Sequence, residues 1–99
     1  MNEINGLYIG DVEETNEGLF IRIYYLDKER QELNEKFNAH FSMSEWITMV
    51  LNLKTKEVKH IVAYSEADNK EYDVSSFFTE SQINNFIKGS EHYVSSSVW

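Results

Sequence analysis

The sequence lacks cysteine and proline, and it contains only four glycines among its 99 residues. Without cysteine the chain can form neither a disulfide framework nor a thiolate metal site. It also lacks any run approaching the roughly 18 apolar residues that a membrane span requires. No basic segment followed by an apolar run stands at its start. We therefore expect a cytoplasmic protein that does not enter a membrane.

Positive charge is scarce as well. Nine Lys and Arg residues stand against 17 Asp and Glu residues, so the formal net charge is −8. Excess negative charge opposes contact with phosphate backbones and anionic lipids, which argues against direct nucleic-acid binding and against membrane binding. Lys54, Lys56, Lys59 and His60 form one local basic patch. Lysines in such a turn usually serve solvation, so the patch does not change this expectation.

Motifs for catalysis and metal binding are missing too. The chain contains neither a Gly-x-Ser-x-Gly motif nor a Gly-rich phosphate-binding loop. His40, His60 and His92 lie in separate segments, without the short spacing that is typical of a metal site. Pairs of carboxylates are uninformative in a chain with 17 acids, because the separation that matters for acid–base chemistry is spatial. We therefore expect no enzymatic activity, no metal ion and no cofactor.

The residues that are present indicate one folded domain. Hydrophobic residues make up 41% of the chain and aromatic residues 14%, which is enough to offset the entropy of chain ordering. No linker and no internal repeat divides the sequence, so residues 1–99 are expected to form a single domain. Residue types with AT-rich codons, such as Phe, Ile, Asn, Lys and Tyr, are abundant. This composition points to an AT-rich bacterial genome, or to a phage or plasmid within one.

Segments rich in β-branched and aromatic residues predict strands in the first half of the chain. Residues 7–12 and 19–26 indicate a hairpin, because residues 15–18 between them carry turn chemistry. Residues 27–32 are interpreted as a charged connector. Residues 33–41 are the strongest strand prediction, since apolar and polar side chains alternate there. The apolar face of this strand would carry Leu33, Phe37, Ala39 and Phe41.

Residues 43–53 allow two interpretations. A helix would begin at a capping box formed by Ser42 and Glu45. A strand is favoured by the Trp, Ile, Thr and Val content of the segment, and we prefer it. The strand would place on one side Ile47, Met49, Leu51 and Leu53.

The remaining segments predict two more strands and a helix. Residues 58–64 have the pattern of a central strand, and residues 72–77 follow it after a turn. The face of the central strand that carries Val58, Val62 and Tyr64 is opposite the face that carries Ile61 and Ala63. The helix is predicted over residues 80–88. Its start is indicated by Thr79 and Gln82 as a capping box and by Phe78 and Ile83 as a hydrophobic staple, and its end by Gly89.

These elements predict an α+β fold: an antiparallel β-meander of five or six strands with the C-terminal helix packed on one face. The expected core consists of Leu19, Ile21, Ile23, Phe37, Phe41, Ile47, Leu51, Val58, Val62 and Phe86.

Clusters of acidic side chains are the leading candidates for function. We expect a non-enzymatic protein-binding module, either an accessory factor or an inhibitor encoded by a phage or plasmid. Its acids would mimic nucleic acid toward a basic, nucleic-acid-binding protein, and they would steer association more than they add affinity. The expected partner-binding residues are Glu29, Glu32, Glu35, Glu66 and Asp68.

An alternative from another class remains open. A small-molecule-binding or enzymatic domain would assemble its site from aromatic and histidine side chains, and a deep apolar pocket with convergent polar groups would favour it. Flat surfaces would favour the protein-binding module. A homodimer formed through edge strands or an exposed aromatic patch fits either hypothesis. The residues of the alternative site are Tyr24, His40, Trp46, His60 and Tyr64.

Overall fold

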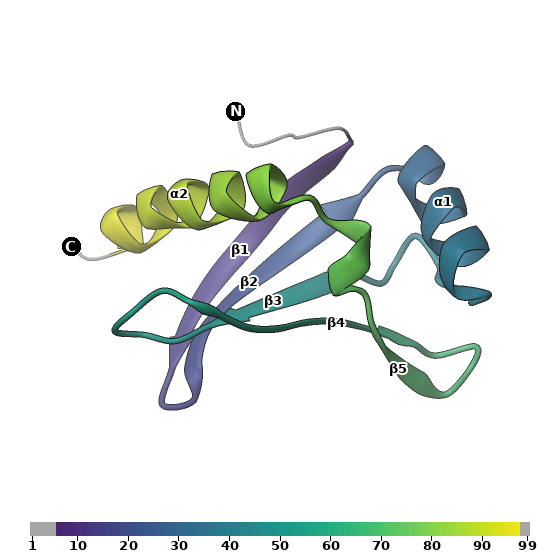
Figure 1. Cartoon of the computed structure of the whole chain (residues 1–99), viewed down its shortest axis with the longest axis horizontal. Helices are drawn as coiled ribbons and strands as arrows, with labels where there is room; N and C mark the ends of the chain where they lie inside the picture. The colour runs from purple at the N-terminus through teal and green to yellow at the C-terminus, as the bar shows by residue number, and fades with distance from the viewer. Residues whose placement is uncertain (1–5, 98–99) are drawn as a thin grey trace.

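The computed structural model describes residues 6–97 and has the predicted α+β architecture (Figure 1). Its five strands form one antiparallel sheet in the order β1-β2-β3-β4-β5, so each strand lies beside its neighbour in the sequence. The C-terminal helix crosses one face of the sheet over β1 (Figure 1). In chain order the elements are β1 (Leu7–Thr15), β2 (Gly18–Tyr25), α1 (Asp27–Phe37), β3 (Ile47–Leu51), β4 (Val58–Ser65), β5 (Lys70–Asp73), the short 3-10 helix η1 (Ser75–Phe77) and α2 (Glu80–Ser97).

The predicted N-terminal hairpin is confirmed. Leu7 pairs with Tyr25 at its open end, and Thr15 pairs with Gly18 at the turn. Gly18 has a φ of 146°, and a Cβ there would overlap the carbonyl oxygen of Leu51 on the neighbouring strand. Both conditions favour glycine, because only a residue without a Cβ adopts this conformation at so little cost. Both the turn conformation and the close approach of β3 therefore require glycine at position 18.

Within the ambiguous segment 43–53, residues Ile47–Leu51 form strand β3, as we preferred, and the residues on either side are turns or irregular. Ile47, Met49 and Leu51 are buried on one side of β3, as the period of a strand predicts, and Val50 on the other side is buried as well. Leu53, predicted on the same side, lies beyond the end of the strand and is half-buried. The capping interaction also exists, since the Ser42 N–H donates to Glu45 Oε1 (2.8 Å). It closes a turn that leads into the strand and does not begin a helix.

The prediction for residues 27–41 is wrong. Neither a charged connector over 27–32 nor a strand over 33–41 forms; residues Asp27–Phe37 are helix α1. Most residues here are straight-chain Lys, Glu, Arg, Gln and Leu, which lose little side-chain freedom in a helix. Leu33 and Phe37 are four residues apart, a spacing that fits one side of a helix as well as one side of a strand. Intrinsic propensity therefore decided an ambiguous pattern.

Helix α1 ends just before residues 39–41, where buried and exposed side chains alternate. Asn38 follows α1 with a φ of 52°, a left-handed conformation that asparagine tolerates. Beyond it Ala39 and Phe41 are buried and His40 is exposed, as the alternation predicts, although this segment is not part of the sheet. The side chain of Asn34 forms the two backbone hydrogen bonds with Phe41 that a neighbouring strand would otherwise form. It accepts from the Phe41 N–H (2.6 Å) and donates to the Phe41 carbonyl (3.2 Å).

Two details of the next strands differ from expectation. In β4 the core face carries Ile61 and Ala63, whereas Val62 is half-buried and Tyr64 exposed on the opposite face. Val62 is thus not a core residue. Residues 72–77 are not a continuous strand, since β5 ends at Asp73 and η1 follows.

The predicted start of the C-terminal helix is confirmed and its predicted end is wrong. The Gln82 N–H donates to Thr79 Oγ1 (3.1 Å), and the Thr79 N–H donates to Gln82 Oε1 (2.8 Å), so the capping box is complete. The helix continues beyond Lys88 to Ser97. Ser90 is buried, and the hydroxyl of Tyr93 donates to the Ile9 carbonyl of β1 (3.1 Å). Packing of this second half on the sheet offsets the low helix propensity of Gly89.

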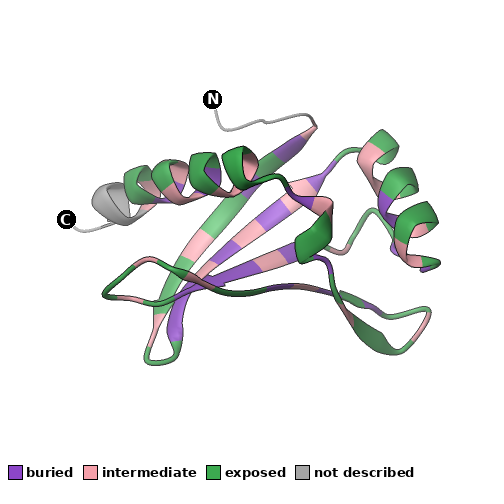
Figure 2. Cartoon of the chain, in the orientation of Figure 1, coloured by how far each residue is buried: buried purple, intermediate pink, exposed green. Residues whose placement is uncertain are grey.

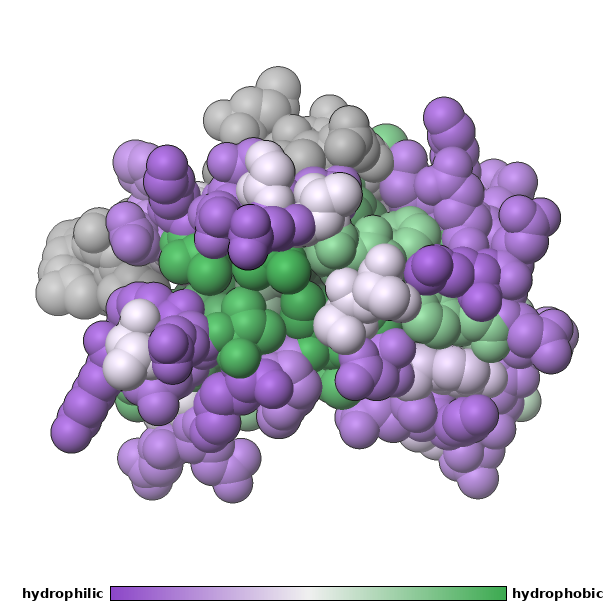
Figure 3. Space-filling model, viewed as in Figure 1, coloured by the Kyte–Doolittle hydropathy of each residue, from purple (hydrophilic) through white to green (hydrophobic). Residues whose placement is uncertain are grey.

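The core lies between the sheet and α2. Figure 2 shows buried positions alternating along β2, and Figure 3 shows polar side chains on the outside of α2 with apolar surface between this helix and the β3–β4 turn. Phe37 and Val58, expected in the core, are half-buried at its edge. Among residues 6–97 no helix is long and apolar enough to cross a membrane. The expected core residues that are buried are Leu19, Ile21, Ile23, Phe41, Ile47, Leu51 and Phe86.

Candidate functional site

The face of the sheet opposite α2 carries a row of aromatic side chains. Tyr8 of β1 pairs directly with Tyr24 of β2. Ile47, the first residue of β3, pairs with Ile23 of β2 and with Ala63 of β4. When both registers are continued by one position, Trp46 lies beside Tyr24 on one side and beside Tyr64 on the other. Four consecutive strands or strand ends thus contribute one ring each. We call Tyr8, Tyr24, Trp46 and Tyr64 the aromatic row.

The rings of the first three strands are in contact. The ring centroids of Tyr8 and Tyr24 are 5.8 Å apart, and those of Tyr24 and Trp46 are 6.2 Å apart in an edge-to-face arrangement. Gly10 permits this packing, because a Cβ there would overlap the ring of Tyr24. Tyr8, Trp46 and Tyr64 are 38%, 41% and 47% exposed. Large apolar side chains are therefore held in fixed positions at the surface.

A cavity of about 320 Å³ opens at the β4 end of this row. The residues that line it include the aromatic residues Trp46 and Tyr64 and three acidic residues, Glu45, Glu66 and Glu71. The volume is near the lower end of ligand pockets, which span about 300–1,000 Å³. We call it the Trp46–Tyr64 cavity.

Internal hydrogen bonds fix two groups of this cavity. Glu45 accepts from the Glu66 N–H through Oε2 (2.6 Å), in addition to the Ser42 N–H on its other oxygen. The hydroxyl of Tyr64 donates to Asn69 Oδ1 (2.6 Å). Within residues 6–97, none of the carboxylates of Glu45, Glu66 and Glu71 forms an ion pair. The cavity thus combines positioned rings with uncompensated negative charge.

The one arginine on this face is already neutralised. Arg22 lies on β2 and donates to Asp11 (2.9 Å) and to Glu13 (3.0 Å) of β1. The hydrogen bond to Glu13, with the charges of both acids, raises the pKa of Arg22 above its usual value. Its charge is engaged across the hairpin, so it does not offset the carboxylates near β4.

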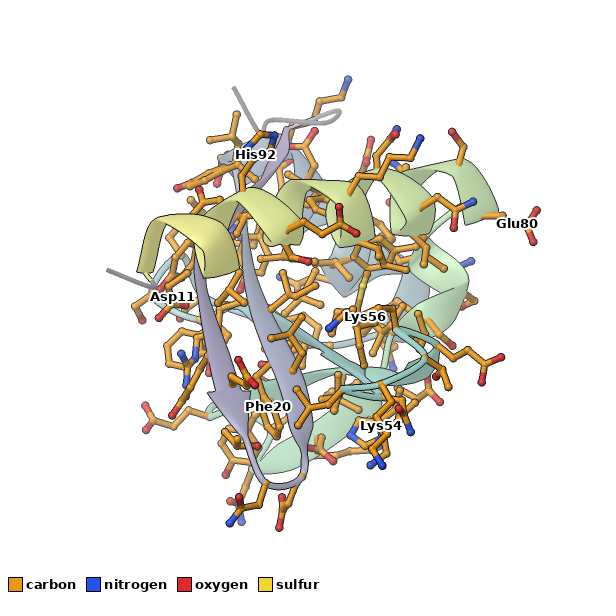
Figure 4. All side chains as sticks on the ribbon, turned by 90° about the vertical axis from the view of Figure 1, so that its left-hand side faces the viewer. Asp11, Phe20, Lys54, Lys56, Glu80 and His92 are labelled. Atoms are coloured by element: carbon orange, nitrogen blue, oxygen red, sulfur yellow. The ribbon has the colours of Figure 1, made fainter. Side chains whose placement is uncertain are left out.

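Two lysines of the basic patch in the β3–β4 turn form hydrogen bonds to backbone carbonyls of nearby turns. Lys56 donates from Nζ to the Leu53 carbonyl (2.9 Å), and Lys59 donates from Nζ to the Glu17 carbonyl of the neighbouring hairpin (3.0 Å). Figure 4 shows Lys54 and Lys56 on this turn, with Lys56 on the side nearer α2. These contacts support the interpretation as turn lysines.

The predicted acidic residues fall into two groups at the same end of the sheet, on α1 and on the β4–β5 turn (Figure 1). Glu32 and Glu35 are exposed on α1, whereas Glu29 is half-buried with its carboxylate against Gly6. Glu66 is exposed and lines the Trp46–Tyr64 cavity. The structure thus brings one of the five predicted residues, Glu66, into contact with the aromatic row's cavity.

Asp68 is occupied by internal bonds. It accepts from the backbone N–H of His40 (2.8 Å), from the Ser65 hydroxyl (2.9 Å) and from the Tyr72 hydroxyl (3.0 Å), and it lies 2.7 Å from His40 Nδ1. These hydrogen bonds, the one with the His40 ring first, lower the pKa of Asp68 to about 2. Its oxygens anchor the segment after α1 to the β4–β5 turn.

The alternative site is brought together only in part. Tyr24, Trp46 and Tyr64 belong to the aromatic row, but His40 points to Asp68 and His60 pairs with Val50 farther along the sheet. In the described part of the chain no group of three or more His, Asp or Glu side chains could hold a metal ion. The structure therefore contains the aromatic half of that site without its histidines.

Sequence reasoning missed Glu45 and Glu71. The sequence could have indicated Glu71, because a turn over residues 66–69 pairs Glu71 with Tyr64 across the β4–β5 hairpin. Glu45 gave no signal beyond its capping interaction with Ser42. Comparison with known protein families, with curated proteins and with solved structures finds no match for this chain.

Proposed function

We propose that this chain is a non-enzymatic protein-binding module whose contact surface is the aromatic row. The observation that carries the proposal is the row itself: four aromatic rings in register, on a sheet face that neither helix of residues 6–97 covers. Tyr and Trp are enriched among residues that dominate binding energy, because rigid rings bury a large area at little entropic cost. Exposed aromatic side chains gathered on one face of a small domain are a feature of interaction sites.

The charge of the chain specifies the kind of partner. A net charge of −8 and the unpaired carboxylates beside the row favour a basic protein surface. Nucleic-acid-binding proteins present such surfaces. An accessory factor or an inhibitor carried by a phage or plasmid, competing with nucleic acid for its target, is the form of this function that the composition supports.

A small-molecule site is less well supported by the geometry. The Trp46–Tyr64 cavity is small and open to solvent, and the histidines expected to supply its polar chemistry lie elsewhere. An open cavity of this size suits one side chain of a larger partner better than a free substrate.

Affinity capture from a lysate of the source organism tests the proposal. The wild-type protein is compared with Tyr8→Ala/Trp46→Ala, and the matched control is Leu26→Ala/Met43→Ala, which removes two exposed apolar side chains outside the row. We expect a retained basic protein with the wild type and the control, and its loss with the row variant. Circular dichroism and denaturant midpoints establish that all three are folded.

Two outcomes would contradict the proposal. Equal retention by the row variant would show that the row is not the contact surface. Absence of any protein retained above a mock surface would count against a protein-binding function altogether.

A further inference from the structure

We infer that the Trp46–Tyr64 cavity receives an arginine side chain of the partner. The inference rests on the proposed function, because it assigns the chemistry of one subsite on the same surface. Two observations carry it: the interruption of the aromatic row and the charge of the residues that line the cavity. The chemistry of the guanidinium group then selects arginine among the cations.

The aromatic row is interrupted at the cavity. Tyr8, Tyr24 and Trp46 form a continuous series of ring contacts, but within the described residues no ring contact joins Trp46 to Tyr64. The register nevertheless places these two side chains beside each other when the Ile47–Ala63 pair is continued by one position, to Trp46 just before β3 and Tyr64 on β4. The cavity lined by both rings occupies that position. A flat group stacking on either ring would complete the row.

The charge of the lining favours a cation. Glu45, Glu66 and Glu71 all border the cavity, and no Lys, Arg or His of residues 6–97 forms an ion pair with them. Aromatic faces also attract cations, since the π-system carries partial negative charge. Rings and carboxylates therefore favour the same kind of ligand and disfavour an anion or a neutral apolar group.

The spacing of the carboxylates excludes a bare metal ion as the best occupant. No three acidic side chains in the described residues lie close enough together to hold a metal. A larger organic cation can reach acids that are spread around a cavity. The class of ligand is thus a cationic side chain rather than an inorganic ion.

A guanidinium group fits better than an ammonium group. It is planar, so it can stack on Trp46 or Tyr64, and it presents several N–H donors in a fixed fork that matches carboxylates. Glu45 is held by two backbone N–H groups and keeps further acceptor capacity on both oxygens. Ser44 and Thr48 line the same cavity; the Ser44 hydroxyl is hydrogen-bonded to the Ser42 hydroxyl (3.0 Å), so the Thr48 hydroxyl is the better acceptor for a remaining donor.

The test titrates the chain of residues 1–99 with short capped peptides and follows amide and indole resonances by NMR. The probes are Gly-Arg-Gly, the same peptide with neutral citrulline in place of arginine, and Gly-Lys-Gly. We expect the arginine peptide to shift the Trp46 indole and the Glu66 amide resonances, and to bind at least about tenfold more tightly than the citrulline peptide. The lysine peptide should bind more weakly than the arginine peptide.

Matched charge variants separate the cavity from general electrostatics. Glu71→Gln should weaken binding of the arginine peptide by about fivefold, while Glu80→Gln, which removes the same charge from the exposed side of α2 on the other face of the sheet, should leave it unchanged. Trp46→Phe keeps a ring and should retain binding, whereas Trp46→Ala should lose it. NMR spectra of each variant show whether the fold is kept.

The inference is overturned if the citrulline or lysine peptide binds as well as the arginine peptide, if Glu80→Gln and Glu71→Gln act equally, or if no cavity resonance moves. Such a result would leave the proposed function standing when capture still depends on Tyr8 and Trp46. Loss of that dependence would instead contradict the proposed function.

Discussion

Asp68 connects two segments that are distant in the sequence. Its carboxylate accepts hydrogen bonds from His40, 28 residues earlier, and from Ser65 and Tyr72 on the two strands beside its own turn. The side chain is 18% exposed, so these bonds are partly shielded from water. A residue expected at a partner interface thus has a structural role that links the end of α1 to the sheet.

The lowered pKa of Asp68 predicts a specific pH dependence of stability. Because this pKa falls to about 2 in the folded chain, from about 3.9 in an unfolded one, the folded state binds fewer protons between these values. The stabilisation is therefore present above pH ~4 and is lost as the pH falls toward ~2. Asp68→Asn should lower the urea midpoint at pH 7 and differ less from the wild type near pH 2.5.

Glu66→Gln is the control for this measurement, since Glu66 is exposed on the same turn and its carboxylate forms no ion pair in the described residues. A constant difference between Asp68→Asn and the wild type across the pH range would contradict the assignment.

At the scale of elements, α1 shows how a pattern with two meanings is decided. Apolar residues at positions 33 and 37 satisfy both a strand and a helix. The helix is distinguished by contacts that a strand would not make: Asn34 is half-buried and bonds to both backbone groups of Phe41. In a strand with Leu33 inward, the side chain of Asn34 would face solvent.

This difference gives a prediction for Asn34→Ala. The substitution leaves the N–H of Phe41 without its acceptor in a partly buried place, so it should cost about 1–3 kcal/mol in the free energy of unfolding. Glu35→Ala, next to it and exposed, should change that free energy by less than about 0.5 kcal/mol. Denaturant unfolding of both variants is the measurement. Equal and small effects would favour the strand interpretation.

At the scale of the whole molecule, the two faces of the sheet have different surroundings. One face packs against α2 and forms the core, which includes the fully buried Phe86, Met49 and Ile61. The other face keeps rings and charges at the surface. Acidic residues of α1 and of the β4–β5 turn lie at the end of the sheet where the Trp46–Tyr64 cavity opens.

This arrangement predicts how salt affects association with a basic partner. Raising the salt from about 50 to 300 mM shortens the Debye length from roughly 14 to 6 Å, so steering by exposed carboxylates should weaken. Glu32→Gln/Glu35→Gln should mainly lower the association rate, because these exposed acids of α1 are not among the residues that line the cavity. Glu71→Gln should mainly raise the dissociation rate, because its carboxylate borders the contact.

Surface plasmon resonance with the captured partner measures both rates at both salt concentrations. Salt-independent binding would sink the electrostatic part of the proposal and leave an apolar contact through the aromatic row. Simultaneous binding of nucleic acid and this protein to the partner would contradict competition between them.

Local chemistry made much of the fold predictable from the sequence. The hairpin, the strand at residues 47–51 and the start of α2 depend on interactions within about four residues, such as turn chemistry, alternation and the Thr79–Gln82 capping box. These features follow from the order of residues alone. Tyr24, Trp46 and Tyr64 are candidate site residues for their aromatic side chains. The exposure of Tyr64 was not predicted, because Val58 and Val62 on its face of the strand were expected in the core.

Only the tertiary structure decided the rest. The extension of α2 beyond Gly89 depends on packing against Ile9, and the contact of His40 with Asp68 depends on how α1 meets the β4–β5 turn. The cavity depends on the register that pairs Ile47 with Ala63 and Tyr64 with Glu71. Register and packing join residues that are many positions apart, and a single sequence does not state which of its distant residues will meet, because that choice is made by the burial of the whole core.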